Sequence, residues 1–159
     1  MKRFRISIMF MALVIILLGD VTTASAVMAS ASQKEIIALE DGCYIETEVC
    51  DVVPEVSLLA TEKTLTKTKT MYYKNQSGTV LWSLSITATF TYDGKSAKCI
   101  RCSHDTSVLE KGWSIKSCSS SKSGNSATVR CVAAHVVNSS TKDFSTSITI
   151  QCSKDGKVS

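Results

Sequence analysis

The chain has 159 residues and a formal net charge of +4, and 6% of its residues are aromatic. Because few aromatic side chains are free to interleave with the basic ones, the sequence gives no sign of a nucleic-acid-binding surface. Roughly 133 residues follow the first 26, which is the length of one domain, and none of their apolar runs is long enough to span a membrane.

Residues 1–26 have the order of a secretory signal peptide. A basic start precedes an apolar run of 14 residues, Ile6 to Gly19, and a small-residue pattern follows at Ala24-Ser25-Ala26. The apolar run is shorter than the roughly 20 residues of a spanning helix. We expect cleavage after Ala26, with Ala29-Ser30-Ala31 as a second site, and a secreted, extracellular product. An uncleaved N-terminal anchor is the alternative.

Residues 27–62 and 63–159 carry opposite charges. The first part has eight acidic residues and one lysine, a net charge of −7, whereas the second has 14 basic and five acidic residues, a net charge of +9. This shift predicts a boundary near residue 62, between an acidic arm, largely unstructured or loosely packed, and a basic domain. Within the arm a short helix over 33–40 is a further hypothesis. The arm could also lie on the basic domain and screen its charge.

Alternating apolar and polar residues predict β-strands in the basic domain. Over residues 79–92 the apolar residues share one parity and Thr and Ser the other, with Leu81 as the exception. This segment is long for one strand, so we expect a bend or bulge. Similar patterns predict strands over 65–74, 96–103, 113–121, 126–137 and 144–152. The chain is therefore predicted to be all-β, an immunoglobulin-like antiparallel β-sandwich of six or seven strands with Greek-key connections, or else a small β-barrel.

Four stretches of the basic domain carry a resemblance to a group of proteins. They are TVLWSLSITATFTYDGKSAKC, GWSIKS, SKSGNSATV and TSITIQCSKDGKVS. Over roughly residues 64–159 this pattern is similar to small exported β-sandwich proteins of Gram-positive gut bacteria of the Firmicutes type. The resemblance implies an exported β-sandwich in which the cysteines at Cys99 and Cys152 recur, and it implies no activity.

The hairpin around residues 124–125 predicts one disulfide bond. If these two residues form the loop, Cys118 lies opposite Cys131, within the reach of a disulfide. The same register places Trp113 and Ile115 on the core face. The bond between Cys118 and Cys131 is then expected on the opposite, outer face.

The seven cysteines of the chain predict further disulfides and, because seven is odd, one remaining thiol. We expect Cys99 and Cys152 to form a buried bond between strands or sheets, worth roughly 4 kcal/mol. Cys43 and Cys50 are then expected to pair within the acidic arm. Cys102 is left as the candidate free thiol, through which two chains could form a dimer.

The stretch KCIRCSH, residues 98–104, has half the pattern of a zinc site. Cys99, Cys102 and His104 offer three ligands where structural zinc takes four. A redox Cys-x-x-Cys pair normally opens a helix, and no helical pattern follows here. We therefore interpret the stretch as one disulfide partner and one thiol, and predict no metal or cofactor.

The function predicted from these features is that of a non-catalytic binding module, at the cell surface or outside the cell. His104 and His135 are the two imidazoles, the acids of the basic domain lie mostly at turns, and no catalytic motif is visible. The candidate binding residues are Lys67, Lys69, Lys95, Lys98 and Arg101. Their partner would be an anionic cell-wall polymer or another extracellular protein. The alternatives are a secreted antagonist (bacteriocin-like or an effector), an enzyme, or lysines that are merely solvated.

Overall fold

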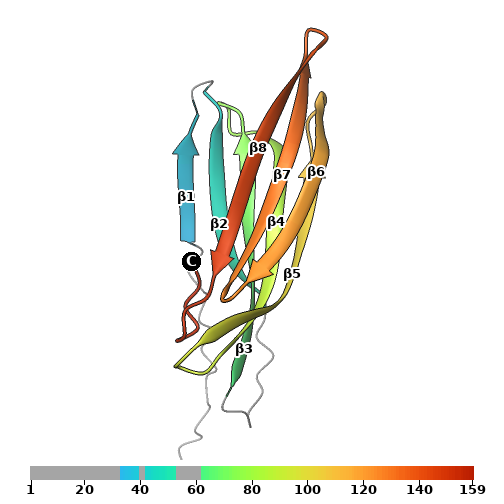
Figure 1. Cartoon of the computed structure of the whole chain (residues 1–159). Coiled ribbons are helices and arrows are strands. Elements are labelled where there is room, and N and C mark those ends of the chain that lie inside the picture. The colour runs from blue at the N-terminus through green and yellow to red at the C-terminus, as the bar shows by residue number, and fades with distance from the viewer. Residues whose placement is uncertain (1–32, 40–41, 53–61) are drawn as a thin grey trace, which may run out of the picture.

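The computed structural model describes residues 33–39, 42–52 and 62–159, and the expected signal peptide lies outside these residues. In the described part, eight antiparallel strands form two sheets that face one another (Figure 1). The strands are β1 (Gln33–Ala38), β2 (Tyr44–Val52), β3 (Lys63–Lys74), β4 (Val80–Tyr92), β5 (Ala97–Val108), β6 (Trp113–Ser123), β7 (Ser126–Val137) and β8 (Ser140–Gln151). These residues include no helix long and apolar enough to cross a membrane.

The all-β sandwich predicted from the alternating pattern is confirmed. The first sheet has the strand order β1-β2-β3-β4-β5 and the second the order β6-β7-β8. Within each sheet the described strands are thus neighbours in sequence as well as in space. A Greek key instead returns a later strand to the side of an earlier one, so the expected Greek-key connections are not those of the described strands.

The described part of the acidic segment is folded, which corrects two predictions. Gln33–Ala38 is a strand and not a short helix, and it pairs with β2. In turn β2 pairs with β3 along its whole length, from Tyr44 opposite Lys74 to Val52 opposite Thr66. A short isolated helix is unstable in water, whereas a strand gains backbone hydrogen bonds from its neighbour. The segment supplies the first two strands of the five-stranded sheet.

Opposite charges connect the acidic and basic parts of the chain. Glu46 on β2 accepts hydrogen bonds from Lys74 Nζ at 2.9 Å and from Lys34 Nζ at 3.3 Å. Asp51 and Lys67 form a further ion pair between β2 and β3. The hypothesis that the acidic segment lies on the basic domain therefore agrees with these contacts.

Three β-bulges change which residues face the core. One extra residue enters β4 at Leu81, β5 at Ile100 and β6 at Lys116. An extra residue shifts the alternation of faces by one position, so the pattern beyond it is inverted. The irregularity expected in the long fourth strand is thus present. It allows Leu81 to be buried although it shares the parity of the polar residues of this strand.

The core lies between the sheets and is filled by alternate residues of facing strands. Tyr73, Trp82, Trp113 and Phe144 form an aromatic cluster with ring centroids 4.9 to 6.3 Å apart. Trp82 and Trp113 are 1% and 8% exposed, which confirms that the apolar parity of residues 79–92 and Trp113 face the core. Other apolar side chains, among them the buried cysteines, fill the rest: Met71, Leu81, Leu84, Ile86, Ala88, Phe90, Cys99, Ala127, Val129, Cys131, Ala133, Ile148, Ile150 and Cys152.

Candidate binding surface and cysteine cluster

A hollow of about 480 Å³ opens on the outer face of the five-stranded sheet. We call it the outer-face hollow, and its lining residues are Val52, Thr64, Leu65, Thr66, Thr89, Ile100 and Arg101. They come from the four adjacent strands β2 to β5. Of these seven residues only Arg101 is charged, so a ligand in the hollow would meet a positive charge, hydroxyl groups and apolar side chains.

The hydroxyl groups of the hollow belong to ordered rows of threonine across β3 and β4. Thr66 and Thr89 are opposite one another with their Oγ1 atoms 3.0 Å apart, and Thr68 and Thr87 repeat the contact at 2.8 Å. β-Branched threonine suits a strand surface, and its hydroxyl can donate one hydrogen bond and accept others. The polar parity seen in the sequence therefore forms a surface that can hydrogen-bond a hydroxylated ligand.

Arg101 reaches the outer face because of the bulge at Ile100. Cys99 lies opposite Phe90 and is buried, whereas Arg101 lies opposite Thr89 and is exposed. Without the extra residue, Arg101 would share the inward face of Cys99. The bulge also leaves Ile100 45% exposed, at the wall of the hollow.

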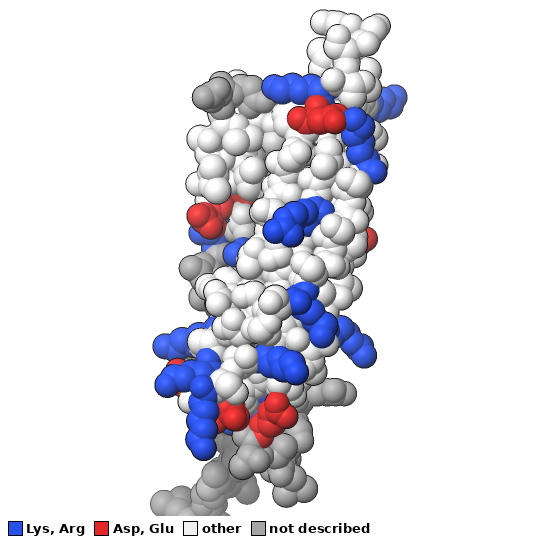
Figure 2. All heavy atoms as spheres, in the orientation of Figure 1, with Lys and Arg blue, Asp and Glu red and all other residues white. Residues whose placement is uncertain are grey.

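Of the five predicted binding residues, one lines the outer-face hollow and two follow it toward the β4–β5 turn. Lys95 is exposed in the β4–β5 turn, Lys98 is exposed opposite Thr91, and Arg101 lines the hollow itself. Figure 2 shows the opposite side of the sandwich, where β6 to β8 lie in front, and there Lys and Arg side chains are spread along the whole length with acidic side chains among them.

The other two candidate binding residues, Lys67 and Lys69, do not share the outer face of the hollow. Their partners on β4 are Ala88 and Ile86, which are 0% exposed, so both lysines lie on the inward parity of β3. The side chain of Lys67 is only 19% exposed and is paired with Asp51. The sequence showed alternation in β3 but not which parity faced the core.

Asp93 stabilises the β4–β5 turn. Its Oδ1 accepts hydrogen bonds from the backbone N–H groups of Lys95 at 2.9 Å and Ser96 at 2.7 Å. These backbone hydrogen bonds, that of Ser96 first, lower the pKa of Asp93. The turn is also fixed from outside, because the Gly94 N–H donates to the carbonyl of Lys154 at 2.9 Å. This carboxylate therefore has a structural role.

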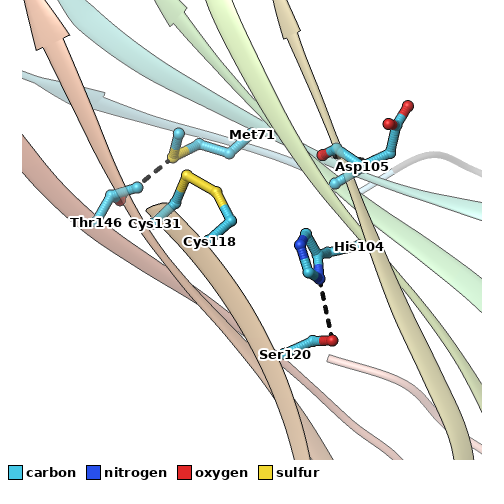
Figure 3. Close-up of a disulfide and its surroundings, with 8 residues drawn as sticks. Met71, His104, Asp105, Cys118, Ser120, Cys131 and Thr146 are labelled. Atoms are coloured by element: carbon cyan, nitrogen blue, oxygen red, sulfur yellow. Dashed lines mark hydrogen bonds between the residues drawn. A yellow bond between two sulfur atoms is a disulfide. The ribbon is translucent and has the colours of Figure 1, made fainter. Parts of the chain in front are cut away.

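The predicted bond between Cys118 and Cys131 is confirmed, but its predicted face is wrong. The two residues are opposite one another on β6 and β7 and form a disulfide (Figure 3). Cys131 is 2% exposed and belongs to the core. The extra residue at Lys116 inverts the alternation of faces along β6. Cys118 therefore faces inward like Ile115, although the two residues are an odd number of positions apart.

The expected bond between Cys43 and Cys50 is excluded by strand β2. Cys43 directly precedes this strand and Cys50 lies within it, seven residues further on. An extended strand advances about 3.3 Å per residue, which separates the two residues by roughly 20 Å. A disulfide needs Cα atoms within about 7 Å.

Three more cysteines gather at the end of the core beside the β6–β7 turn. Cys99 and Cys152 are 2% and 0% exposed, and Cys102 is half-buried. All three are thiols in the structure. Burial raises the pKa of Cys99 and of Cys152, and the neighbouring thiols raise both further. The two cysteines expected to form a bond, Cys99 and Cys152, are thus both buried in the same part of the core.

The two histidines lie in different settings. His104 Nδ1 is 3.1 Å from the Ser120 hydroxyl, between β5 and β6 (Figure 3), and His135 stacks on Trp113. Among the described residues, no group of three or more His, Cys, Asp or Glu side chains could hold a metal ion.

Comparisons with known proteins give no functional information. No family model matches the chain, and no curated protein matches it. Among solved structures, it is similar to the crystal structure of a hypothetical protein from Listeria monocytogenes EGD-e, with a TM-score of 0.42 and 20% identity, over 80% of this chain and 95% of that one.

Proposed function

We propose that this protein is an exported, non-catalytic binding module whose ligand is an anionic, hydroxyl-rich polymer, such as a phosphate-bearing cell-wall polymer. The outer-face hollow is the proposed site. The observation that carries the proposal is the placement of Arg101 beside rows of threonine hydroxyls, with no acidic residue among the described residues that line the hollow. Export is supported by the leader-like pattern of residues 1–26.

The chemistry of the hollow suits a polyol phosphate. A guanidinium group presents paired donors that match the oxygens of a phosphate, and such charge-assisted hydrogen bonds are stronger than neutral ones. Thr66 and Thr89 can exchange hydrogen bonds with sugar or glycerol hydroxyls. Lys95 and Lys98 extend the positive charge along a polymer longer than the hollow, so binding should weaken as salt increases.

The test is retention of the protein on cell walls that carry poly(glycerol phosphate), against walls stripped of it. Arg101→Gln should weaken retention about five- to thirtyfold, which corresponds to the roughly 1 to 2 kcal/mol of one charge-assisted hydrogen bond. Arg130→Gln is the matched control, because Arg130 is exposed on β7 in the other sheet. It removes the same charge and should change retention little.

Each other outcome points elsewhere. Equal losses in the two arginine variants would mean that net charge alone drives retention, and equal retention on stripped walls would remove the polymer as ligand. Growth inhibition of related cells by the purified protein would support a secreted antagonist instead. Turnover of the polymer would support an enzyme.

A further inference from the structure

The backbones of Cys99 and Cys152 are fixed at one tight turn although they come from different sheets. The N–H of Cys99 donates to the carbonyl of Gly124 at 2.8 Å, and the N–H of Cys152 donates to the carbonyl of Asn125 at 3.0 Å. Gly124 and Asn125 are consecutive residues of the β6–β7 turn. The Asn125 side chain also donates to the carbonyl of Cys152 at 2.7 Å. The turn therefore holds both cysteines side by side.

Both side chains point into the same part of the core. They belong to one cluster of buried residues. Their thiolate forms would be close enough to repel one another, because Cys99 raises the pKa of Cys152 and Cys102 raises that of Cys99. Each buried thiol now donates only to a backbone carbonyl beside it, Cys99 to Arg101 and Cys152 to Ser153, both at 3.3 Å.

Cys102 is the poorer partner for Cys99, although the two are close in sequence. Across the bulge at Ile100, the two lie opposite Phe90 and Ala88, which are two residues apart on β4. They are therefore about 7 Å apart, at the upper limit for the Cα atoms of a disulfide. Bonding within β5 would therefore distort a strand that is paired with β4 through Arg101 and Cys102. A bond from Cys99 to Cys152 needs no such break, because the two residues approach from different sheets.

We propose that Cys99 and Cys152 form a disulfide that links the two sheets when the chain folds in the presence of a disulfide oxidant, and that Cys102 keeps its thiol. One of the two thiolates attacks a sulfur of the oxidant, R–S–S–R, and releases one R–S⁻. The second thiolate then attacks the mixed disulfide and releases the other. The protein loses two thiol protons and two electrons, and the oxidant becomes two R–SH. With the Cys118–Cys131 bond, this leaves Cys102 as the remaining thiol of the cysteine cluster, and Cys43 and Cys50 as thiols elsewhere.

The sequence allows the bond to be identified directly. The full-length chain is refolded with oxidised glutathione, its remaining thiols are blocked with N-ethylmaleimide in denaturant, and trypsin is added without reduction. Because Lys98 and Arg101 flank Cys99, cleavage isolates the tripeptide 99–101, while Cys102 falls in 102–111 and Cys152 in 143–154. We expect a linked pair of 99–101 with 143–154, and maleimide on 102–111. Linked peptides 117–122 and 131–142 report that oxidation took place.

Two results would overturn the proposal: maleimide on both Cys99 and Cys152 in protein whose Cys118–Cys131 bond has formed, or a linkage of 99–101 with 102–111. Two variants add a second readout. Cys102→Ala should keep the linked pair, whereas Cys152→Ala should lose it. Cys152→Ala should also narrow the difference in Tm between oxidised and reduced protein, and Cys102→Ala should leave that difference unchanged.

Discussion

His135 on β7 lies flat against Trp113 on β6, with ring centroids 4.5 Å apart and ring planes inclined by 7°. The two residues are directly opposite one another in the sheet. Gly112 precedes Trp113 with a φ of +84°, and a Cβ there would lie 3.4 Å from the His135 ring. Through Trp113, which is 8% exposed, the stack joins His135 to the aromatic cluster. The second histidine of the basic domain is thus a packing residue.

The first prediction concerns this stack. His135→Ala should lower the free energy of unfolding by about 1 kcal/mol, the typical worth of a stacked aromatic pair, and Trp113→Ala by about 3 to 5 kcal/mol, because it leaves a cavity in the core. Urea unfolding followed by circular dichroism measures both. His104→Ala is the control, since His104 is exposed and its loss should stay within about 0.5 kcal/mol. A larger loss for His104 than for His135 would contradict the assignment.

The second prediction uses two glycines with nearly the same backbone conformation. Gly94 and Gly156 have φ values of +82° and +80°, which L-residues rarely adopt. A Cβ on Gly156 would lie 2.5 Å from the Tyr92 ring, whereas one on Gly94 would meet nothing within 4 Å. Gly94→Ala should therefore cost about 1 kcal/mol of backbone strain, and Gly156→Ala distinctly more. Thermal unfolding gives the comparison, and equal shifts in Tm would mean that the C-terminal turn moves away from Tyr92 freely.

The strands and the first disulfide could be predicted because they depend on local patterns. Alternation gave the core residues of β4, and a two-residue loop at Gly124-Asn125 fixed the register that pairs Cys118 with Cys131. Each depends only on residues close in sequence. The same argument located Trp82 and Trp113 in the core.

What the sequence did not show depends on the bulges and on pairing between distant strands. One inserted residue at Lys116 reversed the face of Cys118, and one at Ile100 carried Arg101 outward. No turn signal or change of composition marks either position. The face of Lys67 could not be predicted for a related reason: it is set by pairing with Ala88, a residue in another strand. The outer-face hollow is assembled from four strands and has no sequence motif of its own.

The third prediction concerns the order in which thiols react in the reduced protein. Burial raises the pKa of Cys99 and of Cys152, so at a given pH fewer of their thiols are ionised, and both are screened from reagent. Cys102 is half-buried and should be alkylated before either. Timed iodoacetamide labelling of the reduced, folded chain, followed by tryptic digestion, gives the order. In denaturant the differences should vanish, and their persistence there would mean that burial is not their cause.

The fourth prediction concerns the ion pair that attaches β2 to β3. The hydrogen bond from Lys74 lowers the pKa of Glu46, and Glu46 in turn raises the pKa of Lys74. A lowered carboxyl pKa contributes stability above its unfolded value of about 4.3, and this contribution is lost as the pH falls through the folded pKa. A raised lysine pKa contributes below about 10.4, and that contribution is lost as the pH rises through the folded pKa. Both contributions are therefore present at neutral pH, and the attachment should weaken at either extreme.

Amide hydrogen exchange can detect this change at the strands concerned. Relative to pH 7, the protection of the β2 amides should fall at pH 3, after correction for the intrinsic exchange rate, and that of β7, in the other sheet, should fall less. Lys74→Met should return the pKa of Glu46, followed by NMR titration of its carboxyl carbon, toward its ordinary value. Lys116→Met is the matched control: it breaks a different ion pair, with Asp143 at 2.7 Å between β6 and β8, and should leave Glu46 unchanged. A Glu46 carboxyl that titrates alike in wild type and Lys74→Met would show that Lys74 does not hold this strand through its charge.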